Sequence, residues 1–321
     1  MTTRRILLGA SLALPALGAK AQAPGNWPER PVRLVVAFAP GGFADLIGRM
    51  LGEHLGPLWR QTVVVENRGG AGGNVAAQQI ARAAADGYTG LVTTGAFAIN
   101  PSLSRNPGYR PDQFAVAAVV GGTPNLFVVR ADSPIRSMRD LVEVGRRRPI
   151  NYGTAGVGVA AHLSAELFFR RVGGVDAQHI PYAGAGPAML ALLAGTVDMV
   201  ATSLPSAVAQ VQGGQARGLA VTSDRRSSAM PEVPTVAEAG FEPLVDVAWV
   251  ALLFPAATPE PILRKVNEDV TRVMALPAFQ QRLLANGFDP MGGDLRAVND
   301  YVAAEVRSWA EIVRMINVQV D

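Results

Sequence analysis

Two glycine-rich turns are the segments of this sequence best suited to binding a ligand. Residues 40–44 read PGGFA and residues 154–159 read TAGVGV, and each turn follows an apolar run and precedes a helical pattern. Glycines let main-chain N–H groups approach a ligand closely, and the positive end of a helix dipole favours an anion. A tight strand-to-helix connection explains either turn taken alone. Because the turns occupy equivalent places in two similar units, the pair could hold one carboxylate from both sides of a cleft.

Most catalytic and metal-binding chemistry lacks the residues it needs. The chain has no cysteine, which excludes disulfides, thiolate zinc sites, iron–sulfur clusters and cysteine nucleophiles. Its three histidines, His54, His162 and His179, do not have the spacing of a metal site, and structural roles account for them. Neither G-x-S-x-G nor H-E-x-x-H occurs, and no G-K-[ST] follows the glycines of residues 69–73. We therefore expect no catalytic residue, no metal and no cofactor.

One dinucleotide-like motif keeps an enzyme alternative open. Residues 156–161 read GVGVAA, which fits G-x-G-x-x-A between a strand and a helix, and Asp176 lies 20 residues after Gly156. In dinucleotide-binding proteins the acidic residue ends the next strand, whereas Asp176 precedes the strand expected at residues 178–181. A nicotinamide-dependent enzyme is therefore the weaker alternative.

The first 23 residues have the layout of an export signal. Arg4 and Arg5 precede an apolar stretch, and Ala19, Ala21 and Ala23 supply the small residues of a cleavage site. The apolar stretch is too short to span a bilayer, which takes about 20 residues. We expect cleavage near Ala21 or Ala23 and a periplasmic mature protein, with the general and the twin-arginine export routes both open.

Cleavage of this segment changes the charge of the protein. It removes three of the 29 basic residues and none of the 26 acidic ones, so the formal charge falls from +3 to zero. The longest later basic run, residues 146–148, ends a predicted helix, where cations complement the helix dipole. No long apolar stretch follows the signal. We therefore expect a soluble mature protein that does not bind nucleic acid.

The mature chain alternates apolar runs with helical patterns. The first three predicted strands have helices between them, which is the order of a parallel sheet covered by helices. The same alternation returns in a second unit, and beyond about residue 250 the sequence predicts only helices, which must pack on an existing domain. The expected strands are residues 32–38, 62–66, 89–93, 125–129, 150–153, 178–181 and 197–202, and the expected late helices are residues 259–274, 277–285 and 295–316.

These elements predict an α/β fold of two lobes, each with a central sheet flanked by helices, and a cleft between the lobes. Ligands of such folds bind where the carboxyl ends of strands face the cleft. We expect the signal in residues 1–23, lobe 1 in residues 24–122 plus 245–321, and lobe 2 in residues 123–244. The late helices would thus complete lobe 1.

A series of short motifs carries a family resemblance that covers nearly all of the mature chain. The motifs are residues 40–45 (PGGFAD), 64–68 (VVENR), 70–73 (GAGG), 100–101 (NP), 152–158 (YGTAGVG), 181–184 (PYAG), 219–222 (LAVT) and 233–235 (VPT). In this order they resemble the Bug-type periplasmic substrate-binding receptors of tripartite tricarboxylate transporters. The resemblance implies a type II periplasmic-binding-protein fold whose lobes close around a small organic acid without performing chemistry.

Partners follow from the same resemblance. It implies membrane subunits of a tripartite tricarboxylate-type transporter, which would receive the ligand. The alternative is a sensor or scavenger of the same fold that serves a signalling partner such as a sensor kinase. We expect the protein to be a monomer.

The resemblance places the ligand carboxylate on the two glycine-rich turns. Phe43 stands where the family often has a small or polar residue, and Val159 stands where Ser or Thr is common. Phe43 adds an apolar face, and Val159 lacks a possible hydroxyl donor. We also expect polar residues after the third strand, and Tyr182 at a strand end, to face the cleft, while Phe97 fits either cleft wall or core. The candidate ligand-binding residues are Gly41, Gly42, Phe43, Ala44, Asp45, Thr93, Thr94, Phe97, Asn100, Thr154, Ala155, Gly156, Val157, Gly158, Val159 and Tyr182.

Overall fold

The computed structural model describes residues 26–316, so the predicted export signal lies outside the described residues. The first strand, β1 (Val32–Val36), pairs in parallel with β2 (Val63–Asn67) and with β3 (Thr89–Thr94). Four of its five residues are buried, as expected for a strand covered by helices on both faces. The connecting helices are α1 (Phe43–Trp59), α2 (Asn74–Ala81) and α3 (Ala96–Leu103).

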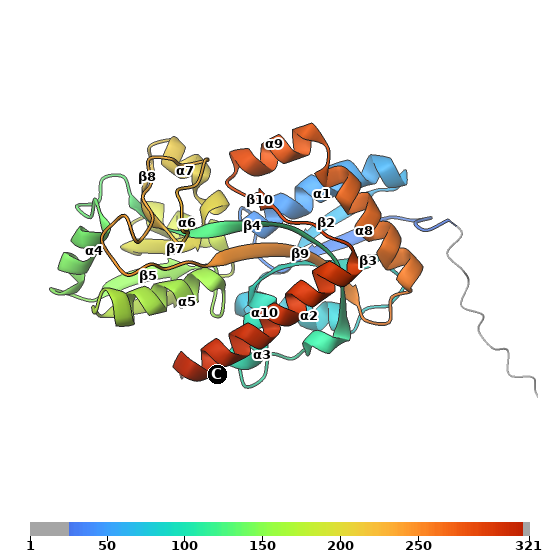
Figure 1. Ribbon diagram of the computed structural model, residues 1–321, viewed down its shortest axis with the longest axis horizontal. Helices are drawn as coiled ribbons and strands as arrows, with labels where there is room; N and C mark the ends of the chain where they lie inside the picture. The colour runs from blue at the N-terminus through green and yellow to red at the C-terminus, as the bar shows by residue number, and fades with distance from the viewer. Residues whose placement is uncertain (1–25, 317–321) are drawn as a thin grey trace, which may run out of the picture.

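Two long antiparallel strands run through the middle of the molecule and join its halves (Figure 1). They are β4 (Phe114–Arg130) and β9 (Val247–Pro255). The first part of β4 pairs with β9, and β9 pairs in turn with β3. The last part of β4 pairs with β7 (Met199–Ser203) and β8 (Ala216–Val221). The described strands form one ten-stranded sheet in the order β2-β1-β3-β9-β4-β7-β5-β6, and two of the ten, one of them β8, pair with β4 outside this order.

The prediction that the chain beyond about residue 250 is only helical is wrong, because β9 lies there. Its sequence, VAWVALLFP, is apolar nearly throughout, and eight of its nine residues are buried. A strand buried on both faces shows no alternation of polar and apolar residues, so periodicity cannot distinguish it from a buried helix. Because β9 and β4 are antiparallel to their neighbours, the sheet is mixed rather than parallel throughout.

The second half of the molecule repeats the strand-helix alternation. In it, β5 (Ile150–Thr154) pairs in parallel with β6 (Ala177–Pro181) and with β7. Ser137 caps the first helix of this half, because its hydroxyl accepts a hydrogen bond from the Asp140 N–H over 3.1 Å. The helices are α4 (Met138–Gly145), α5 (Ala160–Leu167), α6 (Ala185–Leu193) and α7 (Val208–Gln212), and a π turn (Phe168–Val172) extends α5.

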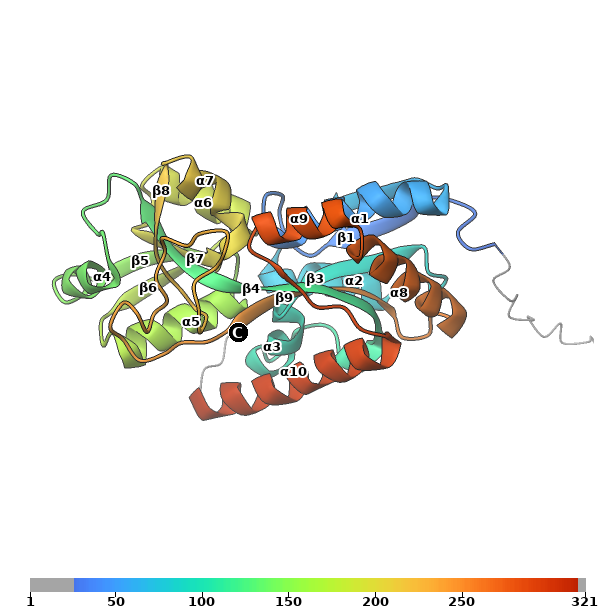
Figure 2. The ribbon, with the colours of Figure 1, turned by 45° about the horizontal axis from the view of Figure 1, so that its top comes forward.

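The C-terminal segment returns to the first half. Helix α8 (Glu260–Met274) packs beside α1, and α9 (Pro277–Ala285) leads to a short strand, β10 (Asp289–Pro290), on β4. Helix α10 (Leu295–Ile316) lies along α3, as Figure 2 shows. Within residues 26–316 no helix is long and apolar enough to cross a bilayer.

We call the half that contains β1, β2 and β3 lobe 1, and the half that contains β5, β6 and β7 lobe 2. Each lobe has a sheet with helices on its faces, which confirms the two-lobed α/β architecture (Figure 1). The exact boundaries between the lobes, at residues 122/123 and 244/245, stay a prediction. Both β4 and the chain before β9 lie at these boundaries.

Candidate ligand-binding cleft

A small cavity lies where the two lobes meet. Its volume is about 30 Å³. A water molecule needs about 10–15 Å³, so the cavity is a closed cleft with room for about two waters. None of its lining side chains carries a charge. The lining residues are Phe38, Gly42, Phe43, Ala44, Thr94, Gly95, Asn125, Ala155, Val159, Ala160, Ala161, Ala185, Thr202, Ser203 and Ala248.

Four helices begin at this cavity. Gly42, Gly95 and Val159 are the residues at the N-terminal ends of α1, α3 and α5, and all three line the cavity. Gly184 precedes α6, whose first residue, Ala185, lines it as well. None of the four has a side chain that caps its helix. Each helix N-terminus carries about half a positive charge, so the four together favour an anion in the cavity.

The first glycine-rich turn is fixed from behind by Asp45. This buried carboxylate accepts hydrogen bonds from the Gly41 N–H over 3.1 Å, from Asn67 over 2.9 Å and from Arg49 over 3.1 Å. Burial opposes its ionisation, but the hydrogen bonds from Arg49, Asn67 and Gly41 outweigh that effect and lower the pKa of Asp45. Asp45 does not line the cavity, and it holds the turn that does.

The second glycine-rich turn is fixed in a similar way by polar side chains behind it. The Thr154 hydroxyl donates to the Gly156 carbonyl over 2.8 Å, and the Gly158 N–H donates to His162 Nδ1 over 3.3 Å. Gly156 and Gly158 have φ values of +137° and +76°, which other residues rarely adopt. These contacts leave Ala155 and Val159 facing the cavity.

Two hydroxyl groups end β7 at the cavity. Thr202 is 1% exposed, and its Oγ1 makes no hydrogen bond with any described residue. Ser203 Oγ bonds Ser206 Oγ over 3.0 Å. A buried hydroxyl without a partner is uncommon in native proteins. Thr202 therefore offers a free polar group on the wall of the cleft.

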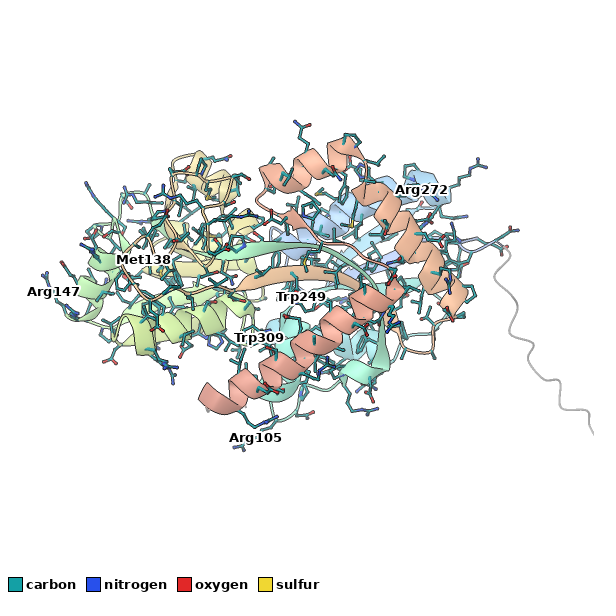
Figure 3. All side chains as sticks on the ribbon, in the orientation of Figure 1. Arg105, Met138, Arg147, Trp249, Arg272 and Trp309 are labelled. Carbon is teal, nitrogen blue, oxygen red and sulfur yellow. The ribbon has the colours of Figure 1, made fainter. Side chains whose placement is uncertain are left out.

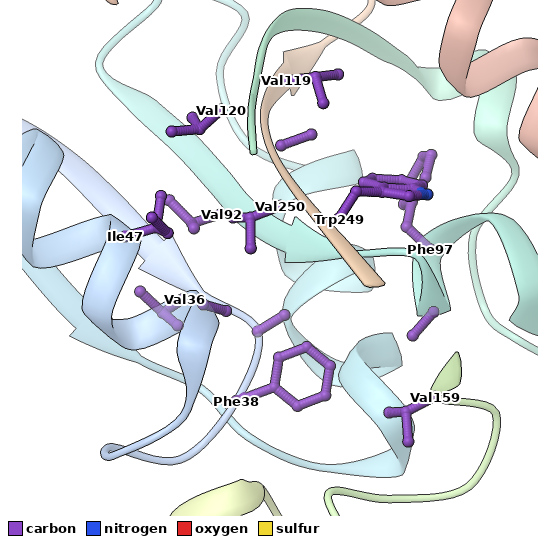
Figure 4. Packing of buried hydrophobic residues seen from close by; sticks show 14 of the residues in the cluster. Val36, Phe38, Ile47, Val92, Phe97, Val119, Val120, Val159, Trp249 and Val250 are labelled. Carbon is purple, nitrogen blue, oxygen red and sulfur yellow. The ribbon is translucent and has the colours of Figure 1, made fainter. Parts of the chain in front are cut away.

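Of the predicted site residues, six line the cavity: Gly42, Phe43, Ala44, Thr94, Ala155 and Val159. Figure 4 shows Phe38, which joins them, and Val159 on facing segments. The other predicted residues in the turns lie just behind this layer. They are Gly41, Asp45, Thr154, Gly156, Val157 and Gly158.

Four further predicted residues lie away from the cavity wall. Phe97 belongs to the core, where it stacks on Tyr109 with ring centroids 5.3 Å apart and lies near Trp249 (Figure 4). Asn100 donates to the Gly72 carbonyl over 3.1 Å. Thr93 is buried beside Thr94. Tyr182 packs against a cluster of buried hydrophobic residues in lobe 2.

The lobes approach each other through glycines. A Cβ added to Gly72 of lobe 1 would lie 2.0 Å from the Val157 carbonyl oxygen of lobe 2. One added to Gly158 would lie 1.8 Å from Asn100 Oδ1. The Ala39 N–H also donates to the Ala183 carbonyl across the cleft over 3.0 Å. Main-chain contact between the lobes therefore requires glycine at these positions.

Several lining residues were not predicted from the sequence: Phe38, Gly95, Asn125, Ala160, Ala161, Ala185, Thr202, Ser203 and Ala248. For Thr202 and Ser203 a signal was present, because Thr202 ends the predicted strand of residues 197–202 and Ser203 follows it, and ligands of α/β proteins bind at the carboxyl ends of strands. Asn125 and Ala248 lie on β4 and β9, and pairing of these distant segments brings them to the cleft.

The metal-ligating side chains of residues 26–316 do not gather into a metal site. Within the described part of the chain, no group of three or more His, Asp or Glu side chains could hold a metal ion. In the basic run after α4, Arg148 forms an ion pair with Asp198 at 2.6 Å. Figure 3 shows Arg147 at the outer end of lobe 2, far from the lobe interface.

Comparisons with known proteins show which family the chain belongs to. Residues 47–318 match the family described as "Tripartite tricarboxylate transporter family receptor". The UPF0065 protein in the tcbD-tcbE intergenic region of Pseudomonas sp. (strain P51) is 33% identical over 317 residues, which cover 97% of this chain and 93% of that protein.

Two solved structures are similar over most of their length. The periplasmic binding protein BugD has a TM-score of 0.87 and 34% identity, covering 91% of this chain and 99% of BugD. R. palustris Rpa4515 with adipate has a TM-score of 0.87 and 33% identity, again covering 91% of this chain and 99% of the other. With the family match, these similarities show that the chain belongs to the tripartite tricarboxylate transporter family receptors of the Bug type and has their periplasmic-binding-protein fold.

Proposed function

We propose that this protein is an exported receptor that captures a small organic carboxylate between its lobes and delivers it to the membrane subunits of a tripartite tricarboxylate-type transporter. The observation that carries the proposal is the uncharged cavity at which four helix N-termini meet. Helix N-termini supply N–H donors and positive potential without a charged side chain. The adipate bound by the similar R. palustris protein supports a dicarboxylate as the class of ligand.

The lining supports binding rather than catalysis. It combines the N-terminal ends of four helices with the hydroxyl-bearing residues Thr94, Thr202 and Ser203 and with apolar side chains. An acid–base or nucleophilic mechanism needs a group whose pKa or activation suits proton transfer or attack. His162 and His179 bond the second glycine-rich turn, residues 154–159, and neither of them lines the cavity. These groups suit the reversible binding of an anion.

The dinucleotide alternative is less well supported by the structure. Asp176 is exposed and immediately precedes β6, so it stands at the amino end of that strand. The acidic residue that binds a ribose stands at the carboxyl end of its strand. The cleft lies at the carboxyl ends of the strands, whereas Asp176 precedes the amino end of β6.

Capture requires the lobes to move. The cavity of about 30 Å³ is smaller than a dicarboxylate such as adipate. The ligand must therefore enter an open form, and closure would then exclude water from the cleft. Because the lobes are joined by β4 and the segment before β9, bending of these two connections would open the cleft.

Thermal unfolding with a panel of acids tests the proposal. Mature protein, freed of any co-purified ligand by unfolding and refolding, is heated with adipate, malate, citrate and monocarboxylates in turn. A true ligand at 100 times its Kd stabilises the folded form by about 2.7 kcal/mol. Absence of any shift across the panel would contradict carboxylate binding.

We further propose that the cleft prefers an acid less polar than citrate. Phe38, Phe43, Val159 and Ala248 make one part of the lining apolar. Phe43 is held by stacking on Phe288, with ring centroids 6.2 Å apart. A Phe43→Ser variant should shift the ratio of adipate to citrate affinity toward citrate, and an unchanged ratio would refute the preference.

Location is tested separately. Cleavage after Ala21 or Ala23 would leave a mature chain that begins at Gln22 or Pro24. N-terminal sequencing of protein released from the periplasm should find one of these ends. Transport is tested by ligand uptake in cells that lack the gene, since a sensor would leave uptake unchanged.

A further inference from the structure

We propose that His162 and His179 are positioning residues that hold the second glycine-rich turn, residues 154–159, in its ligand-gripping shape. The inference rests on the proposed function of the cleft. The two rings stack inside lobe 2, with centroids 4.0 Å apart and an interplanar angle of 24°. Each ring bonds a different end of the turn, so the pair acts as a two-point support behind it.

His162 supports the end of the turn that leads into α5. Its ring is 4% exposed, and Nδ1 lies 3.3 Å from the main-chain nitrogen of Gly158. A main-chain N–H can only donate, so Nδ1 must accept and the proton of the neutral ring lies on Nε2. This bond holds Gly158 at its left-handed φ of +76°.

His179 supports the start of the turn through Thr154. Its Nε2 lies 2.7 Å from Thr154 Oγ1. The single hydroxyl proton of Thr154 goes to the Gly156 carbonyl over 2.8 Å, and the hydroxyl oxygen accepts from the Gly156 N–H over 3.2 Å. With the hydroxyl proton on that carbonyl, we infer that His179 Nε2 donates to Thr154 Oγ1, so that both neutral histidines carry their proton on Nε2.

The surroundings keep both rings neutral. Burial lowers the pKa of His162 to about 4, and the nearby positive charge of Arg170 adds to that effect. Burial lowers the pKa of His179 to about 3, with a further lowering by His162 and an opposing influence of Glu166. Tyr152 stacks on His179 at 5.1 Å and donates its hydroxyl proton to Glu166, which pairs with Arg170. Among residues 26–316, Arg170, Glu166 and Tyr152 are the ionisable groups that act on the pKa values of the pair or stack on its rings.

Neutrality matters because the turn depends on an acceptor at His162. If His162 Nδ1 carried a proton, two donors would face each other, Nδ1–H and the Gly158 N–H. The hydrogen bond between them would then be lost. A second charged ring at the stacking distance would add repulsion between like charges. The turn, and with it the N-terminus of α5 at the cavity, would then move out of place.

Paired substitutions separate this role from simple packing. In His162→Asn the amide oxygen can replace Nδ1 as acceptor, whereas His162→Leu fills the space without an acceptor. In His179→Gln the amide nitrogen can replace Nε2 as donor, whereas His179→Leu cannot. His54→Asn is the control, because His54 lies in α1 of lobe 1 and packs edge-on against Phe279.

Two measurements on the full mature chain test the proposal. Nitrogen NMR of the three histidine rings, without ligand at pH 7, should show His162 and His179 protonated on Nε2 only. His54, whose Nδ1 lies 2.8 Å from the Met50 carbonyl and must donate to it, should show a protonated Nδ1. Adipate affinity, measured by calorimetry, should fall about tenfold in His162→Leu and by less than about threefold in His162→Asn.

Either of two results would overturn the proposal. A proton on His162 Nδ1 in the ligand-free protein would contradict the acceptor role directly. Equal affinities of His162→Leu and His162→Asn would show that only packing matters. If the leucine variants do not fold, the ring NMR and the amide exchange rate of Gly158 in the asparagine variant still decide. If wild-type protein binds no acid, the proposed function fails, while the ring measurement still judges the support of the turn.

Discussion

The Phe43 N–H of lobe 1 donates a hydrogen bond to the Ser206 hydroxyl of lobe 2 over 3.1 Å. Phe43 is the first residue of α1, and Ser206 follows β7 in a short 3₁₀ helix, Leu204–Ser206. Ser206 also bonds Ser203 on the cavity wall. The Phe43 N–H at the N-terminus of α1 thus joins the two lobes. This bond lies at the edge of the candidate ligand-binding cavity.

Ser206→Ala should weaken ligand binding by removing a contact that the closed form makes. A hydrogen bond of this kind contributes about 1 kcal/mol, which corresponds to about a fivefold rise in Kd. Calorimetry and stopped-flow dissociation with adipate measure the change, which we expect mainly in the dissociation rate. Ser228→Ala, at an exposed serine, is the control and should leave Kd unchanged. Equal Kd values for the two variants would refute the closing role.

Thr202→Val should lower ligand affinity without lowering the stability of the empty protein. The buried Thr202 hydroxyl makes no bond with the described residues, so its loss should leave the free energy of unfolding unchanged or raise it by about 1 kcal/mol. If the hydroxyl contacts the ligand, affinity should fall about fivefold to tenfold. Thermal unfolding and calorimetry measure the two effects.

Thr258→Val is the matched control for this substitution. Thr258 is also buried, its hydroxyl likewise bonds no residue in the described part of the chain, and it lies between β9 and α8, away from the cavity lining. It should resemble Thr202→Val in stability and resemble wild type in affinity. An affinity loss in both variants, or in neither, would contradict a ligand contact by Thr202.

Gly72→Ala should block closure of the lobes. The added Cβ would lie 2.0 Å from the Val157 carbonyl oxygen, so the lobes could not reach their present distance. The variant also carries backbone strain of about 1–2 kcal/mol, because Gly72 has a φ of +61°. Gly174→Ala is the control, since Gly174 has a φ of +60° with nothing within 4 Å of its added Cβ. Both variants should lose similar stability, and only Gly72→Ala should lose ligand affinity; equal affinities would show that closure tolerates the clash.

Asp246 should make the folded protein less stable as pH rises from about 4 to about 6. Burial and the nearby Glu305 raise its pKa to about 6 from a usual 3.8, against hydrogen bonds from Ser164 and Asn125. The folded state therefore binds this proton more tightly than the unfolded chain, and the free energy of unfolding falls as the proton is lost. The contribution is up to about 3 kcal/mol.

Urea unfolding at pH 4, 5, 6 and 7 measures this effect as the difference between wild type and Asp246→Asn. The difference removes the opposite contribution of His162 and His179, whose lowered pKa values cost stability as pH falls below about 6.5. Asp198→Asn is a contrasting variant. Burial opposes ionisation of Asp198, but hydrogen bonds from Arg148 and the Asn151 N–H outweigh it and lower the pKa. Its contribution is present above about pH 4 and lost only in more acidic solution, so Asp198→Asn should lower the free energy of unfolding by a nearly constant amount from pH 4 to 7, whereas the difference for Asp246→Asn should change with pH.

The local features of the site were predictable from the sequence. Glycines at residues 41, 42, 156 and 158, each between an apolar run and a helical pattern, indicate two strand-to-helix turns that a ligand can approach closely. The alternation of strands and helices indicates an α/β fold, and the order of the short motifs indicates the family. These properties reside in neighbouring residues, so a linear sequence displays them directly.

The composition of the cavity wall was decided only by the tertiary structure. Asn125, Thr202 and Ala248 come from three strands far apart in the chain, and they meet because β4 pairs with both β7 and β9. Phe97 follows the third strand as a cleft residue would, yet it faces the core, because helix α3 turns its ring onto Tyr109. Closure itself depends on Gly72 meeting Val157 across the lobes. Which side chains reach a cleft follows from long-range strand pairing and from the direction of each helix face, and neither is a property of the local sequence.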